Sequence, residues 1–398
     1  MNIFVINSGS SSIKYQLISM PSENVVCSGL IERIGLLDSM ITHKIQKKGG
    51  DQIIVKTSDI ENHEAGLLEV ASLLTDPTIG VISNPEDIDV VGHRVVHGGE
   101  QFSATVIIDA AVKEEIRKLF PLAPLHNPAN YMGIEVAEKI FTKAKQVAVF
   151  DTAFHQTMPE KAFRYAISNE FYQSYGVRAY GFHGTSHKYV SEKAIEFLGA
   201  DCKKIITIHL GNGCSMAAID NGKCIDTSMG MGPMNGLIMG TRAGDIDQSI
   251  IFHLVNQLGL DLAQVNTLLN KKSGMLGLTG FSDMRDIESA VNEEDTNAIL
   301  ASEMYAYRIK KYIGSYLAAL NGLDAIVFTA GVGENDQRTR KLTCRDLDGL
   351  GIVLDSEKNK IRSKEIREIN AVSSKVKILV VPTNEELEIA KQCFELVG

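Results

Sequence analysis

The chain has 398 residues, 44% of them hydrophobic and 22% charged, with a formal net charge of -9, and its length predicts two domains. No basic run interleaved with aromatic residues occurs, so nucleic acid is not an expected partner, and no stretch approaches the roughly 20 apolar residues of a membrane span. The opening MNIFVINSGSSSIKYQ has no basic start, long apolar core or cleavage-site pattern, so we expect a cytoplasmic protein without membrane partners.

The first expected elements are a strand, a polar turn and a second strand. Residues 3–7 (IFVIN) have the pattern of a short buried strand, 8–12 (SGSSS) form the turn and 13–18 (IKYQLI) the next strand. Small residues let the backbone approach phosphate oxygens and present N–H donors to them. Asn7, at the end of the first strand, is a candidate metal ligand, and Lys14 is a candidate phosphate contact. The alternative is a plain hairpin with a solvated lysine.

The same pattern returns in the second half of the chain, at 204–219 (KIITIHLGNGCSMAAI). At one constant offset, residues of the two segments pair as Ile3 with Ile205, Ile6 with Ile208, Asn7 with His209 and Gly9 with Gly211. Two alignable openings predict a duplicated fold with one phosphate-facing turn in each half. The alternative is a chance similarity.

The remaining regular elements alternate along the chain. Strands are expected at 89–98, 145–151, 324–331 and 377–382, and helices at 134–141, 186–198, 301–320 and 386–397. This alternation predicts α/β layers. We place the domain boundary after Phe150 and Asp151 and expect the last helix to return to the first domain. The six cysteines are scattered without a C-x-x-C pair, so we expect buried thiols rather than a zinc site.

The segment 92–99 (GHRVVHGG) suggests a site for a small acid. Strand alternation puts Arg94 and Val96 on one face and His93, Val95 and His97 on the other. A guanidinium can hold a carboxylate through two parallel hydrogen bonds, and a small apolar neighbour suits a short alkyl tail. The alternatives are an edge-strand arginine in a salt bridge and a histidine metal site, the latter disfavoured because no H-E-x-x-H occurs.

Three further residues lie where α/β proteins bind ligands. Asp151 ends an apolar strand, the usual position of ligand contacts in open sheets. His183 lies in a glycine-flanked turn before a helix, whose N-terminus favours phosphate; with His187 it could bind zinc, but no third ligand is suggested nearby. Arg242 lies in another small-residue loop and could compensate charge on a phosphoryl group.

The C-terminal third contributes a third small-residue turn and an acidic helix start. Gly331–Gly333 follow a predicted strand, although neither G-x-x-x-x-G-K-[ST] nor G-x-G-x-x-G occurs anywhere. Thr383 and Glu386 fit a capping box, which leaves Glu385 free in the first helical turn. A carboxylate there could hold Mg²⁺, or it could simply complement the helix dipole.

Taken in chain order, these segments resemble the acetate kinase family. The motifs that carry the resemblance are NSGSSSIKY, GHRVVHGG, PLAPLHNPAN, FDTAFHQTMP, GFHGTSH, HLGNG, DTSMG, MGTRAGDID, SDMRD, FTAGVGEN and PTNEE. The resemblance implies an α/β, duplicated actin-like (ribonuclease H-like) two-domain kinase fold with central mixed sheets, as in sugar kinases and chaperone ATPases. Residues 1–151 with 385–398 would carry the metal, phosphate and part of the carboxylate site, and 152–384 the nucleotide-binding and transition-state residues.

The resemblance also implies roles for individual residues. The implied metal ligands are Asn7 and Glu385, and the implied catalytic residues are Asp151, His183 and Arg242. The implied substrate pocket is formed by Arg94, Val96, Leu125, His126, Phe182 and Pro233. The implied ATP-binding residues are Lys14, His209, Leu210, Gly211, Asn212, Gly213, Asp283, Met284, Arg285, Gly331, Val332, Gly333, Glu334 and Asn335.

The implied reaction is reversible phosphoryl transfer from ATP to acetate, giving acetyl phosphate and ADP, with Mg²⁺, or alternatively Mn²⁺, in a homodimer. A carboxylate is already ionised at neutral pH and needs no general base, so we expect direct in-line attack, with Asp151 orienting neighbouring groups. A phosphorylated carboxylate, for example on Glu385, is the rival route.

Two departures from the family pattern concern the acid pocket. The loop that usually reads like GFTPLEGL is here 230–237 (GMGPMNGL), and Ala243 replaces the commoner serine. Propionate or butyrate kinase is therefore the nearest alternative, although Val96 favours the smaller acid. A non-metabolic actin-like ATPase is the competing class, and it would lack the pairing of Arg94 with Val96.

Overall fold

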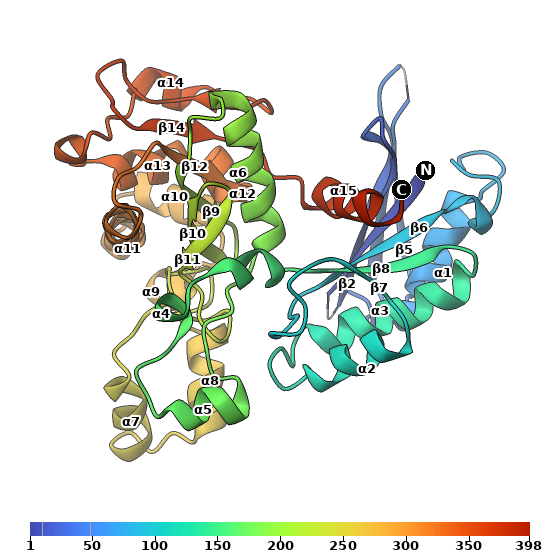
Figure 1. Ribbon diagram of the computed structural model, residues 1–398, viewed down its shortest axis with the longest axis horizontal. Coiled ribbons are helices and arrows are strands. Elements are labelled where there is room, and N and C mark those ends of the chain that lie inside the picture. Colours follow the sequence, from blue (N-terminus) through green and yellow to red (C-terminus); the bar gives the residue numbers. More distant parts are fainter. Residues whose placement is uncertain (10, 48) are drawn as a thin grey trace. The chain divides into compact units, whose positions relative to one another are not determined.

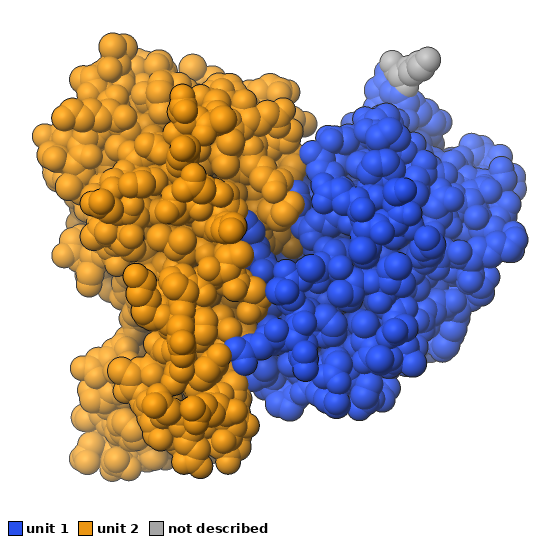
Figure 2. All heavy atoms as spheres, in the orientation of Figure 1, with its two compact units in different colours: residues 1–154, 384–398 blue, residues 155–383 orange. Residues whose placement is uncertain are grey.

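The computed structural model of the protein describes residues 1–9, 11–47 and 49–398, which fold as two units (Figures 1 and 2). Unit 1 contains residues 1–154 and 384–398, and unit 2 contains residues 155–383. The sequence placed these boundaries at 151/152 and 384/385. Ser10, part of the first predicted phosphate turn, lies outside the described residues. Within the described part of the chain, no helix has both the length and the apolar character needed to cross a membrane.

Unit 1 is built on an eight-stranded mixed sheet with the order β5-β4-β3-β2-β1-β6-β8-β7. Its strands are β1 (Asn2–Ser8), β2 (Ser12–Ser19), β3 (Asn24–Glu32), β4 (Ser39–Ile45), β5 (Gln52–Ser58), β6 (Val90–Val95), β7 (Val106–Ile107) and β8 (Lys145–Phe150). Its helices are α1 (His63–Leu74), η1 (Pro85–Asp87), α2 (Ala110–Lys118), α3 (Asn127–Ile140) and α15 (Glu385–Val397). Strand β1 runs antiparallel to β2 and parallel to β6, which is parallel to β8.

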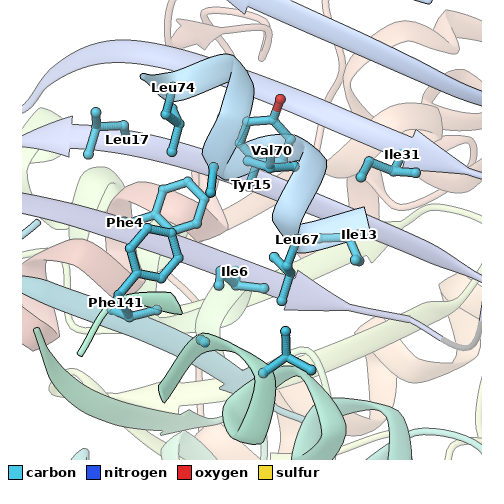
Figure 3. Packing of buried hydrophobic residues seen from close by; sticks show 14 of the residues in the cluster. Phe4, Ile6, Ile13, Tyr15, Leu17, Ile31, Leu67, Val70, Leu74 and Phe141 are labelled. Atoms are coloured by element: carbon cyan, nitrogen blue, oxygen red, sulfur yellow. The ribbon is translucent and has the colours of Figure 1, made fainter. Parts of the chain in front are cut away.

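The core of unit 1 lies between this sheet and helices α1 and α3 (Figure 3). Alternate residues of the strands supply one side of it, as period-two patterning requires. The cluster includes Phe4, Ile6, Ile13, Tyr15, Leu17, Ile31, Leu67, Val70, Leu74 and Phe141. Helix α1 begins at the N-cap Asn62, whose side chain accepts from the Ala65 N–H at 2.9 Å. Packing in this core holds β1 and β2 in place and so positions the residues at the ends of both strands.

Helix α15 packs on the same sheet, against β1 and β6. A close approach at Gly92 of β6 makes this possible, because a Cβ there would lie 2.8 Å from Cys393 Sγ and 2.9 Å from Ile389 Cγ2. No side chain larger than hydrogen fits between strand and helix at this point. The last helix therefore completes unit 1, and its first residue, Glu385, is held at the ends of β1 and β6.

Unit 2 is built on a six-stranded sheet with the order β11-β10-β9-β12-β14-β13. Its strands are β9 (Lys204–Leu210), β10 (Cys214–Asp220), β11 (Lys223–Thr227), β12 (Ala325–Thr329), β13 (Arg367–Glu368) and β14 (Lys377–Val380). After η2 (Ala153–Thr157), which spans the unit boundary, its helices are α4 (Glu160–Phe163), α5 (Asn169–Tyr175), α6 (Gly184–Leu198), α7 (Ser249–Asn256), α8 (Leu262–Lys271), α9 (Gly274–Thr279), α10 (Met284–Asn292), α11 (Thr296–Leu320), α12 (Ala330–Asn335), α13 (Gln337–Cys344), η3 (Asp348–Leu350) and α14 (Ser356–Lys360). Strands β9, β10 and β12 are buried almost throughout, as in sheets covered on both faces.

The two sheets share one topology, which confirms the predicted duplication. The six strands β3-β2-β1-β6-β8-β7 of unit 1 correspond in order and direction to β11-β10-β9-β12-β14-β13 of unit 2. In the first hairpin Ser8 pairs with Ile13, and in the second Leu210 pairs with Cys214, so the second turn is one residue shorter. The repeat in the sequence therefore marks a repeated fold.

Other predicted elements are found, with two corrections. All six cysteines are free and buried, as expected. The strand expected at 89–98 ends at Val95, because side chains of α3 bond the main chain beyond it. The turn expected at Gly331–Gly333 is wrong: these residues lie inside the short helix α12, which follows β12 directly because Ala330 turns the chain with a left-handed φ of 64°.

Candidate active site

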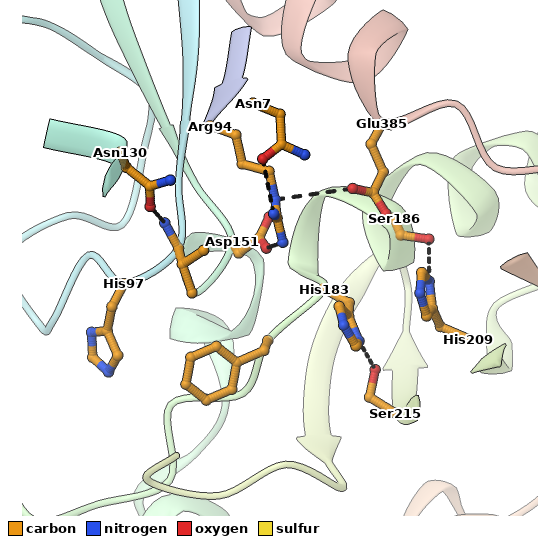
Figure 4. Close-up of polar contacts among 12 residues, drawn as sticks. Asn7, Arg94, His97, Asn130, Asp151, His183, Ser186, His209, Ser215 and Glu385 are labelled. Atoms are coloured by element: carbon orange, nitrogen blue, oxygen red, sulfur yellow. Dashed lines mark hydrogen bonds and ion pairs between the residues drawn. The ribbon is translucent and has the colours of Figure 1, made fainter. Parts of the chain in front are cut away.

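Arg94 lies at the centre of a polar cluster in unit 1 (Figure 4). Its Nη2 forms an ion pair with Asp151, its Nη1 donates to Asn7 Oδ1 at 3.2 Å, and its Nε lies 4.0 Å from Glu385 Oε2. Because β1, β6 and β8 are neighbouring parallel strands, their carboxyl ends bring these side chains to one edge of the sheet. Strand β6 lies inside the sheet, so Arg94 is not the edge-strand residue of the alternative interpretation.

Burial and charge shape the ionisation of this cluster. Burial opposes the charge of Arg94, but the carboxylates of Asp151 and Glu385 outweigh it and hold its pKa above the ordinary value. The pKa of Glu385 is raised to about 7, chiefly by burial and further by Asp151 and Glu386, against the opposing effects of Arg94 and Lys14. The cluster therefore carries more carboxylate than one guanidinium neutralises.

The start of α15 differs from the predicted capping box. The N-cap is Asn384, whose side chain accepts from the Leu387 N–H at 3.0 Å. Thr383 instead shares a hydrogen bond with Ser186 at 2.9 Å. Glu386 forms an ion pair with Lys14 at 2.7 Å, so Lys14, predicted as an ATP contact, has a carboxylate partner within unit 1. The prediction failed because asparagine one residue later caps as well as threonine does.

Helix α3 holds the segment after β6 in place. Asn130 Oδ1 accepts from the Val96 N–H at 3.1 Å, and its Nδ2 donates to the Ser8 carbonyl at 2.7 Å. Asn127 bonds both the N–H and the carbonyl of His97, at 3.0 and 2.9 Å. These bonds replace strand pairing, so Val96 is fixed just beyond β6, where it is buried.

The other residues predicted for the acid pocket have contrasting environments. Leu125 is 59% exposed, and His126 occupies the N-cap position of α3 without a capping hydrogen bond. In unit 2, Phe182 is buried and its carbonyl bonds His155 Nε2 at 3.0 Å. The Pro233 carbonyl accepts from Arg242 Nη1 at 2.9 Å, which ties the divergent loop 230–237 to a predicted catalytic residue.

Two histidines of unit 2 lie side by side, His183 at the start of α6 and His209 in β9 (Figure 4). His183 is the N-cap residue, with a left-handed φ of 58°, and its Nδ1 lies 2.8 Å from Ser215 Oγ. Its ring stacks on His209 at 4.2 Å between centroids, and His209 Nδ1 lies 2.8 Å from Ser186 Oγ. A left-handed non-glycine residue held on two sides is typical of functional sites.

Gly213 brings the two predicted phosphoryl contacts of unit 2 together. A Cβ at Gly213 would lie 3.3 Å from His183 Nε2 and 3.7 Å from Arg242 Nη1. Because Gly213 has no side chain, the space beside His183 Nε2 and Arg242 Nη1 stays open. Burial lowers the pKa of Arg242, with Cys214 opposing.

The remaining predicted nucleotide residues belong to three places in unit 2. Gly211 donates its N–H to the Gly213 carbonyl at 3.0 Å, and Asn212 accepts at its carbonyl from the Gly240 N–H at 3.1 Å. Leu210 is fully buried at the end of β9. Asp283 caps α10 and pairs with the exposed Arg285, next to Met284. Gly331, Val332, Gly333, Glu334 and Asn335 lie in α12.

The structure therefore brings the predicted site residues together in two sets. Unit 1 gathers Asn7, Arg94, Asp151 and Glu385, and unit 2 gathers His183, His209, Gly211, Gly213 and Arg242. Sequence reasoning missed Asn130 and Ser215 and considered His187 only as a zinc ligand. The second asparagine of N-P-A-N was the available signal for Asn130. Among the described residues, no group of three or more His, Cys, Asp or Glu side chains could hold a metal ion.

Comparison with known proteins identifies the family. The acetokinase family model matches residues 2–391. An acetate kinase of Flavobacterium johnsoniae is 60% identical and one of Oleidesulfovibrio alaskensis 55% identical, each over 100% of both chains. The crystal structure of Porphyromonas gingivalis acetate kinase has a TM-score of 0.93 at 46% identity, covering 100% of both chains. A propionate kinase structure from Francisella tularensis has a TM-score of 0.91 at 42% identity, covering 98% of both. This chain is therefore a member of the acetokinase family and a phosphotransferase.

Proposed function

We propose that this protein reversibly transfers the γ-phosphoryl group of ATP to acetate, giving acetyl phosphate and ADP, by direct in-line attack with Mg²⁺. Membership of a kinase family makes ATP and ADP its nucleotide substrates, and the relatives matched over the whole chain are named acetate kinases. The observation that carries the proposal within this chain is the Arg94 cluster, in which a guanidinium near the carboxyl end of β6 is paired with Asp151, two residues before the buried Val96.

In the proposed reaction Arg94 holds the acetate carboxylate as the nucleophile. The carboxylate is ionised at neutral pH, so no base is needed to activate it. Asp151 keeps the guanidinium oriented, a role that its ion pair with Arg94 supports. Holding the nucleophile in line with the phosphorus makes a bimolecular reaction effectively unimolecular.

His183 and Arg242 are proposed to stabilise the transferring phosphoryl group. Both border the space left by Gly213, and phosphoryl transfer relies on donors aimed at the equatorial oxygens. His209, Asn212 and the segments at Asp283 and Gly331 are proposed to bind the nucleotide.

Asn7 and Glu385 are the proposed magnesium ligands. Both offer oxygen atoms, the donors that Mg²⁺ prefers, and the surplus carboxylate beside Arg94 fits an added cation. When bound, Mg²⁺ would neutralise phosphate charge. Mn²⁺ has the same ligand preference and is the alternative.

Acetate is preferred to propionate in this proposal because Val96, which Asn130 holds two residues after Arg94, is the side chain proposed to limit the length of the alkyl tail. One methylene changes discrimination by only about 1–3 kcal/mol, and the loop at Pro233 departs from the family pattern. The similarity to a solved propionate kinase makes propionate the acid to test beside acetate. On the basis of the family resemblance, we also propose that the protein is a homodimer located in the cytoplasm.

The test is acyl-phosphate trapping with hydroxylamine, using ATP, Mg²⁺ and the C1 to C4 acids. We expect the highest kcat/KM for acetate, and inversion at phosphorus with a chiral γ-phosphate. ATP turnover that ignores added acid would favour an actin-like ATPase instead, and retention at phosphorus would favour a phosphorylated carboxylate.

Two variants separate the proposed roles of the arginines. Arg242→Ala should lower kcat by roughly 10²–10³, the usual loss for one preorganised donor, with the acetate KM little changed. Arg94→Ala should lower kcat and also raise the acetate KM, because it removes the carboxylate ligand. Equal effects of both variants on the acetate KM would contradict this division.

A further inference from the structure

A chain of hydrogen bonds leads from the middle of β9 to the ring of His183. Thr207 Oγ1 lies 2.7 Å from His187 Nδ1, His187 Nε2 lies 2.7 Å from Ser215 Oγ, and Ser215 Oγ lies 2.8 Å from His183 Nδ1. Thr207, His187 and Ser215 are each fully buried. None of the three is part of the proposed substrate site.

The direction of the chain follows from its hydrogens. A hydroxyl group has one hydrogen to donate, and a neutral imidazole has one N–H and one acceptor nitrogen. Within the described part of the chain, His187 Nδ1 is the hydrogen-bond partner of the buried Thr207 hydroxyl. A buried hydroxyl left without an acceptor is unfavourable, so Thr207 donates to His187 Nδ1.

The other hydrogens then have one consistent arrangement. His187 is neutral, because burial and the neighbouring His155 and His209 hold its pKa well below the ordinary value. With Nδ1 accepting, its N–H is on Nε2 and donates to Ser215 Oγ. The Ser215 hydroxyl hydrogen is left to donate to His183 Nδ1. The opposite direction would leave the Thr207 hydrogen without an acceptor.

We propose that Thr207, His187 and Ser215 are positioning residues that hold His183 in the tautomer with hydrogen on Nε2. The proposal rests on the phosphoryl-stabilising role given to His183 above. His183 then presents an N–H donor on the edge of its ring that faces Gly213.

The geometry on the far side of His183 fits a donor. A Cβ at Gly213 would lie 3.3 Å from both Cε1 and Nε2 of His183, beside Arg242 Nη1. Phosphoryl oxygens accept hydrogen bonds, so an Nε2–H attracts them and a bare Nε2 lone pair repels them. The His183 ring also stacks on the His209 ring, with 4.2 Å between centroids.

The experiment compares Thr207→Val with Thr207→Ser in the full-length enzyme. Valine keeps the shape of threonine and removes only the hydroxyl, whereas serine keeps the hydroxyl. Long-range proton–nitrogen NMR spectra of the ¹⁵N-histidine-labelled enzyme report the tautomer, and the signals of His183 are assigned by their loss in His183→Asn.

We expect the wild-type spectrum to show His183 protonated on Nε2 and unprotonated on Nδ1. Thr207→Val should mix or reverse the tautomers and lower kcat about tenfold or more, with the KM values for ATP and acetate within twofold. Thr207→Ser should restore both the spectrum and kcat. Ser215→Ala, which removes the last donor, should reproduce the effect if Thr207→Val does not fold.

Three results would overturn the proposal. A wild-type His183 protonated on Nδ1 reverses the chain, and variants with an unchanged His183 spectrum show that the chain does not control it. A shifted tautomer with unchanged kcat refutes the link to turnover. A His183→Asn variant that keeps the wild-type kcat would instead refute the role of His183 in the proposed function. This outcome can be distinguished from failure of the tautomer proposal, because the tautomer is measured separately by NMR.

Discussion

At the scale of single residues, Arg94 shows how a charge is kept in a mostly buried position. Its side chain is 18% exposed, and its ion-pair partner Asp151 is 1% exposed. Removing one partner of such a pair leaves an uncompensated charge, which is more damaging than losing the pair as a whole. The alternative of a structural salt bridge and the proposed substrate role are thus compatible, because the same ion pair that stabilises Arg94 also orients it.

This leads to a prediction for Asp151→Asn, which keeps the shape of the side chain and removes its charge. We expect kcat/KM for acetate to fall by roughly 10²–10³, because the guanidinium loses its orienting partner. The pH at which the rate changes should stay where it is, because Asp151 transfers no proton in the proposed mechanism. The measurement is a pH–rate profile with a Mg²⁺ titration. A controlling ionisation that moves while Mg²⁺ affinity is unchanged would assign proton transfer to Asp151.

At the scale of elements, helix α15 links the last residues of the chain to the first strand. Glu385 is its first residue, and Gly92 allows the helix to lie directly on β6. The position of a proposed metal ligand therefore depends on the absence of a side chain in the middle of a neighbouring strand. An acidic helix start by itself is an ordinary feature, and only the packing of α15 gives this one a partner in Arg94.

We predict that Gly92→Ala lowers both stability and turnover. The new methyl group would meet Cys393 Sγ at 2.8 Å, and overpacking of this kind costs about 1–3 kcal/mol. Displacing α15 also moves Glu385, so kcat should fall and the Mg²⁺ requirement should rise. Urea unfolding and Mg²⁺-dependent kinetics measure the two effects.

The control is the double variant Gly92→Ala with Cys393→Ala, which removes the sulfur that the new methyl group meets. We expect it to recover part of the lost stability and of the Mg²⁺ affinity. The coupling between the two sites should differ clearly from zero in a double-mutant cycle. Strictly additive effects would show that α15 does not press on β6 at this position.

At the scale of the whole molecule, several buried histidines make the fold sensitive to acid. Burial lowers the pKa of His93 to about 4, with a partly opposing hydrogen bond from Gln146, and burial lowers that of His97 to about 4. The unfolded chain binds protons at these residues near pH 6.5, but the folded chain does so only near pH 4. Their contribution to stability is therefore complete above pH 6.5 and is lost as the pH falls toward 4.

We predict that His93→Gln makes the loss of stability in acid less steep. The variant keeps a polar group that can bond Gln146 and removes the proton uptake, worth about 3 kcal/mol between pH 6.5 and 4. Urea unfolding at pH 7, 5.5 and 4 measures the slope. His253→Gln, the same substitution at an exposed position, is the matched control. A His93→Gln slope equal to that of the wild type would refute the assignment.

The sequence alone determined the duplicated α/β plan and the candidates Arg94, Asp151, His183 and Arg242. Runs of apolar residues that end in small polar turns specify strands locally, and the offset between Ile3 and Ile205 marks the repeat without any contact being known. Residues at the ends of such strands can be recognised because parallel neighbours bring their carboxyl ends to one edge. Their roles remain proposals, because local patterns do not show what a side chain binds.

Only the tertiary structure decided which of these residues meet. The partners of Arg94 come from β1, the residue after β8, and α15, and the chain that orients His183 comes from β9, β10 and α6, so no local pattern could specify either set. Strand β6 ends at Val95 because side chains of Asn127 and Asn130 bond the main chain that follows. Helix α15 is capped by Asn384 rather than Thr383. In both places several local hydrogen bonds were possible, and tertiary packing determined which of them formed. The sequence supplied the residues for the chemistry, and the packing of distant segments decided which residues became partners. The physical reason is that a charge or a hydrogen-bond donor that is removed from water needs a partner within the protein, and the fold decides which groups are close enough to be that partner.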